Sequence, residues 1–225
     1  MCYDAAGNVL AELKSSMSGR GYPVDVALSA DGETMQVVYL SVKGTGVTSR
    51  VCYYNFGEKG AEKTDHLMME KEYPGSILAS GFFVDDSVSA VVGDQSLTLF
   101  DGNSTPKEVT EISVKEEIQS VFHSEKYVGL IVKREGKSGY ELRLYNTSGR
   151  SVLTKAFEGT YKTAKISGSQ VIMYDGKKCS IYTRNGIHRF EGEMDHNILE
   201  IIPVGGVNKY IVMNANGMEN VRLVK

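Results

Sequence analysis

Acidic and histidine side chains are the residues of this sequence with the potential for acid–base chemistry. Asp85 and Asp86, with Asp94 nearby, form the densest group of carboxylates. Paired carboxylates act as acid and base where their surroundings separate their pKa values, but we interpret this pair as a polar turn. The four histidines match no catalytic triad and no metal-binding spacing: His66, His123, His188 and His196. No catalytic residues are therefore predicted.

Three widely spaced cysteines, Cys2, Cys52 and Cys179, are the candidates for soft-metal or redox chemistry. They form no CxxC pair, and no histidine lies near enough in the sequence to complete a zinc site. We expect them to be small buried hydrophobic side chains, with a disulfide between Cys2 and Cys52 as the alternative. Neither a metal nor a cofactor is predicted.

Charge and hydropathy exclude two kinds of partner. The chain has 225 residues, with 25 Lys or Arg against 28 Asp or Glu and a formal net charge of −3. This balance offers no general attraction to phosphate backbones, so nucleic acid is not an expected partner. No apolar run approaches the ~18 residues that a membrane helix requires. At 41% hydrophobic residues, the chain can bury a full core.

The stretch GYPVDVALSADGETMQVVYL, residues 21–40, has the pattern of a β-hairpin. Apolar residues from Tyr22 to Leu28 recur with a period of two, which places one set of side chains on each face of a strand. Asp31 and Gly32 follow, a pair suited to a tight turn. The second strand, from Thr34 to Leu40, is apolar on both faces. It is therefore predicted to be an interior strand.

An aromatic residue followed by a polar turn that ends in glycine recurs along the chain. The interval is close to the ~40–50 residues of a four-stranded propeller blade. Strand-like runs lie on both sides of each turn, and no segment has convincing helical periodicity. We expect the repeated aromatic residues to pack between neighbouring sheets: Tyr3, Tyr54, Phe100, Tyr145 and Tyr182.

These units predict an all-β fold, a β-propeller of four-stranded antiparallel blades with about five blades in this chain. Each blade has strands A to D, and stacking of neighbours buries both faces of its sheet. We expect one domain over residues 1–225, which is either a whole propeller or the C-terminal part of a larger one. The predicted blades are 22–70, 77–112, 117–157, 161–191, and 198–224 together with 1–13.

Two arrangements of the ends stay open. In the first, the hairpin at residues 1–13 completes the last blade and closes a five-bladed ring, which removes exposed sheet edges. In the second, preceding blades belong to the same propeller and lie outside this chain. The second is preferred, because a natural protein rarely begins within a hairpin.

Four segments together resemble the C-terminal part of a family of Gram-positive bacterial proteins with a domain of unknown function. They are residues 21–40, VCYYNFGE at 51–58, EIQSVFHSEKYVGLIV at 117–132 and ELRLYNTSGR at 141–150. The resemblance implies an extracytoplasmic β-propeller related to quinoprotein and WD-type repeats. It also implies membrane attachment only through an N-terminal anchor that is absent from this chain. Because the chain has no tryptophan, a quinone cofactor of the quinoprotein kind is disfavoured.

Irregular loops mark the face where a propeller is expected to bind. In a propeller, the D–A connections and B–C turns lie at one end of the blades, and the regular A–B and C–D turns lie at the other. The irregular loops form a mixed, mildly basic rim suited to an anionic or polar partner. The segment at 18–23 is the most suggestive, since Arg and Tyr are common at binding hot spots. The candidate binding residues are Arg20, Tyr22, Lys43, Arg134, Tyr161, Asp195 and His196.

The missing catalytic motifs and the irregular loop face favour a non-enzymatic binding or scaffold module. Its expected partner is a protein, a peptide or a cell-envelope ligand. The alternative is a hydrolase or lyase of the propeller type, with carboxylates and His196 gathered at the mouth of the channel. Fold and loop placement are weak guides to function, so the ligand itself is not predicted.

Overall fold

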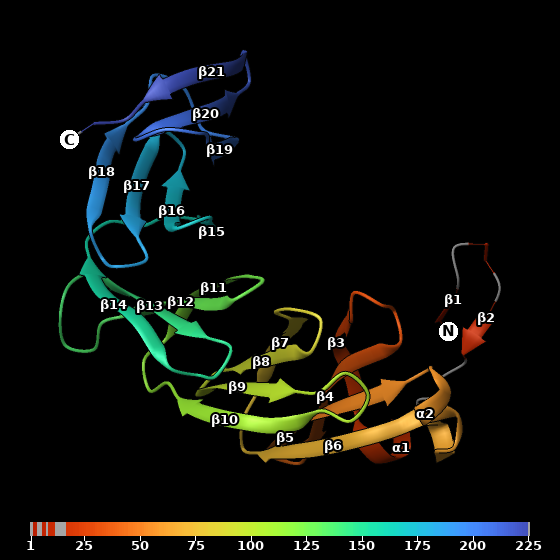
Figure 1. Ribbon diagram of the computed structural model, residues 1–225. Coiled ribbons are helices and arrows are strands. Elements are labelled where there is room, and N and C mark those ends of the chain that lie inside the picture. The colour runs from red at the N-terminus through yellow and green to blue at the C-terminus, as the bar shows by residue number, and fades with distance from the viewer. Residues whose placement is uncertain (1, 4–5, 8, 12–16, 225) are drawn as a thin grey trace. The chain divides into compact units, whose positions relative to one another are not determined.

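The chain divides into two compact units, Met1–Lys115 and Glu116–Lys225. The computed structural model describes residues 2–3, 6–7, 9–11 and 17–224, and Figure 1 labels their strands. In this described part, no helix exceeds four residues, and the strands form four four-stranded sheets, one three-stranded sheet and one two-stranded sheet. The prediction of an all-β propeller fold with about five antiparallel blades is confirmed.

The first unit contains two four-stranded sheets, ordered β3-β4-β5-β6 and β7-β8-β9-β10, and a two-stranded sheet β1-β2. Its strands are β1 (Cys2–Tyr3), β2 (Val9–Ala11), β3 (Tyr22–Leu28), β4 (Thr34–Lys43), β5 (Gly46–Asn55), β6 (Leu67–Pro74), β7 (Leu78–Phe83), β8 (Val88–Gly93), β9 (Ser96–Asp101) and β10 (Lys107–Ser113). Its short helices are α1 (Met17–Arg20), α2 (Glu58–Ala61) and η1 (Thr64–His66).

The second unit contains sheets ordered β11-β12-β13-β14, β15-β16-β17-β18 and β19-β20-β21. Its strands are β11 (Ile118–Ser124), β12 (Tyr127–Lys133), β13 (Tyr140–Asn146), β14 (Ser151–Phe157), β15 (Thr163–Ser167), β16 (Gln170–Asp175), β17 (Lys178–Thr183), β18 (His188–Glu193), β19 (Glu200–Pro203), β20 (Lys209–Asn214) and β21 (Gly217–Arg222). That all blades form one domain, and that the first hairpin completes the last blade, stays a prediction.

The hairpin predicted from residues 21–40 is formed by β3 and β4. Its turn is wider than a two-residue connection, since strand pairing resumes with Leu28 opposite Met35. The Asp31 carboxylate accepts hydrogen bonds from the Ser29 hydroxyl at 2.5 Å and from the Glu33 N–H at 3.0 Å. These bonds hold the pKa of Asp31 below its usual value. Gly32 has φ +75°, a conformation that glycine adopts without strain.

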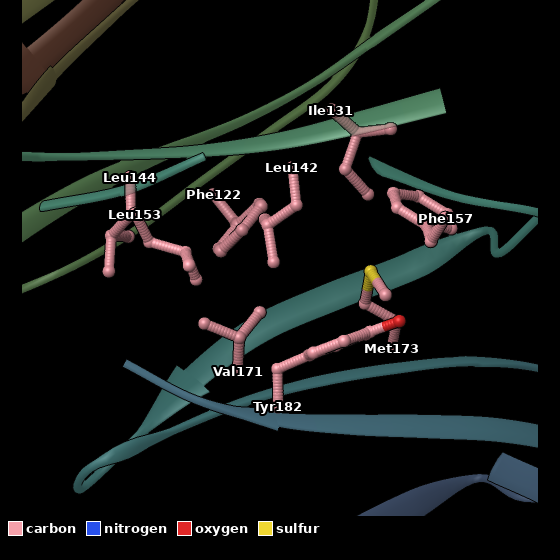
Figure 2. Close-up of a cluster of buried hydrophobic side chains, with 9 residues drawn as sticks. All are labelled: Phe122, Ile131, Leu142, Leu144, Leu153, Phe157, Val171, Met173 and Tyr182. Carbon is pink, nitrogen blue, oxygen red and sulfur yellow. The ribbon is translucent and has the colours of Figure 1, made fainter. Parts of the chain in front are cut away.

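Packing between successive sheets supplies the core of each unit. In the first unit, Tyr53 of β5 contacts Phe100 of β9 with ring centroids 5.3 Å apart. In the second, Figure 2 shows side chains of β11–β14 facing Val171, Met173 and Tyr182 of the next sheet. Burial on both faces explains why the interior strands are nearly continuous apolar runs.

Four of the five repeated aromatic residues are buried, with exposed fractions of 2% for Tyr54, 0% for Phe100, 8% for Tyr145 and 4% for Tyr182. Phe100 and Tyr182 lie in clusters that join two sheets, as predicted, whereas the described cluster around Tyr54 comes from its own sheet. The prediction is wrong for Tyr3, which is 53% exposed. Tyr3 lies in the two-stranded sheet β1-β2, and so small a sheet buries little on its faces.

Cys52 and Cys179 are buried free thiols, which confirms the interpretation of these two cysteines as small buried side chains. Burial raises the pKa of each thiol to about 12, because a thiolate is poorly stabilised away from water. Each buried neutral thiol therefore contributes its full stabilisation at pH values below the pKa of a cysteine in the unfolded chain. This stabilisation is lost as the pH rises through the pKa of the thiol in the folded chain. The side chain of Cys2 lies outside the described residues.

In a Cys2→Ser background, Cys52 and Cys179 are expected to resist iodoacetamide in the folded chain and to react after denaturation. The thiolate is the reactive form, and both its population and its access to reagent are low in the fold. Mass spectrometry should count adducts at about pH 8, with and without guanidinium chloride. Native alkylation as fast as that of the denatured chain would contradict the buried placement.

Candidate functional site

The D–A connections and B–C turns lie together at one end of the blades within each unit; we call this the loop end. In the first unit, the Asp94 carboxylate after β8 accepts hydrogen bonds from the Ser76 hydroxyl at 2.7 Å and the Ile77 N–H at 3.0 Å. In the second, the Ile198 N–H before β19 donates to the Gly176 carbonyl at 2.8 Å. Irregular segments distant in the sequence therefore adjoin.

Three of the candidate residues predicted from the sequence belong to the first unit. Arg20 ends α1, and its Nε lies 3.1 Å from the Glu70 carboxylate. Tyr22 begins β3 and is 64% exposed, so its ring is available to a partner. Lys43 is exposed at the end of β4. Arg20 and Tyr22 are thus sequence neighbours beside an ion pair, and Lys43 lies on a different connection.

The other four candidates belong to the second unit and lie on three connections. Arg134, after β12, donates from its guanidinium to the Ser138 carbonyl at 3.1 Å, which braces its own loop. Asp195 and His196 are exposed between β18 and β19. Arg134 also lines a small pocket of about 180 Å³. Tyr161, between β14 and β15, lines a larger one.

The pocket that includes Tyr161 has a volume of about 370 Å³ and opens at the loop end of the second unit. Each strand of the β11–β14 sheet contributes a lining residue, and the connection 158–162 and the end of β16 supply the opposite wall. Figure 2 shows that two lining residues, Ile131 and Phe157, also lie at one edge of the core cluster near Met173. Its lining includes Gln119, Tyr140, Phe157, Tyr161, Lys162 and Asp175.

A row of three aromatic rings lines this pocket. Tyr140 and Phe157 pair across β13 and β14 and stack with centroids 5.9 Å apart and planes at 29°. Tyr161 also contacts Phe157, with ring centroids 5.9 Å apart and planes tilted at 44°. Burial raises the pKa of the Tyr161 phenol. The phenol is therefore neutral at ordinary pH and its ring is held in place.

A polar rim faces these rings. The Lys162 ammonium lies 3.6 Å from the Asp175 carboxylate, with side-chain exposures of 84% and 28%. An ion pair this exposed contributes at most about 1 kcal/mol, so both groups can exchange partners at little cost. Gln119 and Thr160 add neutral donors and acceptors to the lining.

Glycine at position 139 lets two loops approach each other beside the pocket. Gly139 has φ +78°, and a Cβ there would lie 2.5 Å from the Phe157 carbonyl oxygen. One residue away, the Ser138 hydroxyl donates to the Glu158 carboxylate at 3.2 Å. The B–C loop is thus fastened to the start of the D–A connection, which positions Phe157 and Tyr161.

One described histidine, His188, lies close to both a hydroxyl and a carboxylate. His188 Nε2 lies 3.2 Å from the Ser180 hydroxyl and 3.6 Å from Glu191. A nucleophile–histidine–acid relay uses the two different ring nitrogens, whereas both contacts here are to Nε2, and Ser180 is only 2% exposed. The Asp85 carboxylate accepts backbone N–H bonds from its own turn, as the turn interpretation predicts. No group of three or more potential metal ligands occurs among the described residues.

Comparison with protein families matched residues 1–223 to a family described as one of unknown function, DUF5711. The chain belongs to the DUF5711 family. The resemblance to a family with a domain of unknown function is thereby confirmed. Comparison with curated proteins found no significant match.

Several solved structures are similar to this DUF5711 chain at low sequence identity. Oligogalacturonate lyase in complex with manganese is 11% identical with a TM-score of 0.51, over 89% of this chain and 65% of that one. BamB from Moraxella catarrhalis is 12% identical with a TM-score of 0.45, over 89% and 73%. BBS1N in complex with ARL6DN is 15% identical with a TM-score of 0.48, over 90% and 78%. Within the described residues of the chain, no helix has the length and apolar character needed to cross a membrane.

Sequence reasoning found one wall of the DUF5711 pocket and missed the other. It singled out Tyr161 on an irregular connection, but Tyr140 and Phe157 read as ordinary strand residues. The pairing of Tyr140 with Phe157 could have been predicted. The hairpin of β13 and β14 turns at Gly149, so the first residue of β13 lies opposite the last residue of β14. Nothing in the sequence around Gln119 indicates a pocket residue. Gln119 lines the pocket only because β11 lies beside β12 in the folded sheet.

Proposed function

We propose that this DUF5711 chain is a non-enzymatic binding module that engages a protein, peptide or cell-envelope ligand at its loop end. The aromatic pocket around Tyr161 carries the proposal. Ligand pockets are typically about 300–1,000 Å³ in volume, mostly apolar, with a few placed polar groups. The pocket of about 370 Å³ has this character, and its aromatic rings are of the kind that dominates binding hot spots.

The proposal extends to location and to the outer part of the binding face. We place the protein at the extracytoplasmic face of a Gram-positive cell membrane, attached through an N-terminal anchor outside this chain; the resemblance of the four sequence segments supports this. The other candidate residues on the loop connections are proposed as separate contact points: Arg20, Tyr22 and Lys43 in the first unit, and Arg134, Asp195 and His196 in the second.

Tyr161→Ala is expected to weaken retention of a solubilised Gram-positive envelope fraction on the immobilised chain by about tenfold or more. Removing one hot-spot ring costs roughly 1–2 kcal/mol of binding free energy, and 1.4 kcal/mol is a factor of ten. The measurement is the amount of envelope fraction that gives half-saturation.

Tyr3→Ala is the matched control, because Tyr3 is an exposed tyrosine of the first unit. It should retain the fraction like the parent chain. Circular dichroism must show that both variants keep the parent's strand content. Equal half-saturation by a folded Tyr161→Ala variant would remove the pocket from the proposed function.

A further inference from the structure

We infer that the pocket around Tyr161 binds the ring of an uncharged pyranose sugar within an envelope glycan. This inference rests on the proposed binding function and names the ligand class for the same site. It follows from three features of the pocket: its aromatic surface, its balanced polar rim and the direction from which its lining residues come.

The aromatic surface fits the face of a sugar ring. Aromatic rings carry partial negative charge on their faces, and the C–H bonds on one face of a pyranose carry partial positive charge. The ring centroids of Tyr140 and Tyr161 each lie 5.9 Å from that of Phe157, while Phe157 itself is only 8% exposed. The two partly exposed tyrosine rings and the buried phenylalanine ring therefore form one continuous apolar surface.

The Tyr161 ring is held in place before a ligand binds. It packs against Phe157, with ring centroids 5.9 Å apart. A ring fixed before binding loses little conformational entropy on binding. The apolar surface is thus organised in advance for a flat-faced ligand.

The rim suits the hydroxyl edge of the same ligand. Lys162 supplies donors, Asp175 supplies acceptors, and the 3.6 Å between them exceeds a direct hydrogen bond. Vicinal hydroxyls both donate and accept, so they can bridge such a pair without leaving either charge unmatched. Gln119, which also both donates and accepts, extends this pattern.

Charge balance selects an uncharged sugar over an ionic one. Of the described lining residues, one is cationic and one is anionic, Lys162 and Asp175. An anionic glycan would gain from the lysine but be repelled by the carboxylate at 3.6 Å from it. Neutral hydroxyl groups face no such opposition.

The strands and loops from which the lining residues come favour a compact ring over an extended peptide as the ligand. A peptide that binds by strand addition runs along one sheet edge and uses its backbone hydrogen bonds. Here the lining residues come from the ends of four neighbouring strands, one connection and the next sheet. They converge on a hollow and do not follow one strand edge.

The test is calorimetric titration of the full chain with four probes of stated chemistry. Neutral hexasaccharides of glucose and of N-acetylglucosamine are the positive probes, an oligogalacturonate of equal length is the anionic probe, and a proline decapeptide is the peptide probe. At least one neutral hexasaccharide should bind saturably and more tightly than the other two classes.

Pocket variants separate the sugar contacts from general surface binding. Tyr161→Ala is expected to weaken binding of the neutral hexasaccharide by about tenfold or more, and Asp175→Asn by about fivefold, whereas Tyr161→Phe should stay within about threefold because it keeps the ring. Tyr3→Ala should match the parent chain. Circular dichroism serves again as the folding control.

Several outcomes overturn the inference and are distinguishable from failure of the proposed function. Tyr161-dependent binding of the proline decapeptide without sugar binding would make the site a peptide site. Preference for the oligogalacturonate would overturn the charge argument. Failure of every probe, while Tyr161→Ala still reduces retention of the envelope fraction, would overturn the sugar assignment and leave the binding module standing. Retention independent of Tyr161 would instead reject the proposed function at this pocket.

Discussion

Tyr53→Ala is expected to lower the free energy of unfolding by about 4 kcal/mol, because it leaves a large cavity between two sheets of the first unit. Tyr53 is fully buried and its ring lies 5.3 Å from that of Phe100. Its hydroxyl accepts from the Gln36 side-chain amide at 2.6 Å and shares a hydrogen bond with the Ser89 hydroxyl at 2.7 Å. Removal therefore costs both packing and hydrogen bonds.

Tyr53→Phe divides the loss between these two causes. It keeps the ring and removes only the hydroxyl, so a loss of about 1–2 kcal/mol is expected from the buried polar groups left behind. Urea unfolding monitored by circular dichroism measures all variants, and the exposed Tyr22→Ala should lie within about 0.5 kcal/mol of the parent. If Tyr53→Ala and Tyr53→Phe unfold at the same urea concentration, the packing role of the ring is wrong.

Phe122→Ala is expected to cost about 3 kcal/mol in the second unit, and Gly129→Val about 2 kcal/mol. The two residues face each other across β11 and β12. A Cβ at position 129 would lie 2.2 Å from the Phe122 ring, so a larger side chain there must displace that ring. Figure 2 shows Phe122 within the cluster that joins two sheets, which leaves the ring little room to move.

The double variant is the informative measurement. Valine at 129 fills part of the space that Phe122→Ala vacates, so the double variant should be more stable than the summed losses imply by about 1–2 kcal/mol. The four proteins of the cycle are compared by urea unfolding. If the stability losses of the two single variants sum to the loss of the double variant, the direct contact between the Phe122 ring and position 129 is contradicted.

Local physical chemistry determined the strands and most of the buried side chains. Alternation with a period of two in β3, apolar character on both faces of β4 and the Asp31–Gly32 turn act over a few residues, so they were readable in order along the chain. The aromatic residue before each glycine turn has the same place in successive blades, which is why Tyr54, Phe100, Tyr145 and Tyr182 were predicted to be buried and are. Tyr3 has the same local pattern but not the sheet needed to cover it.

Tertiary structure alone decided which side chains form the pocket. An irregular connection carries Tyr161, which made it a candidate, yet the other six candidates lie on four other connections. Phe157 and Asp175 belong to different sheets and meet only because those sheets stack. Stacking brings strand ends together according to sheet order and register. These are set by the sum of many side-chain contacts across the core, and no short stretch of sequence contains that sum.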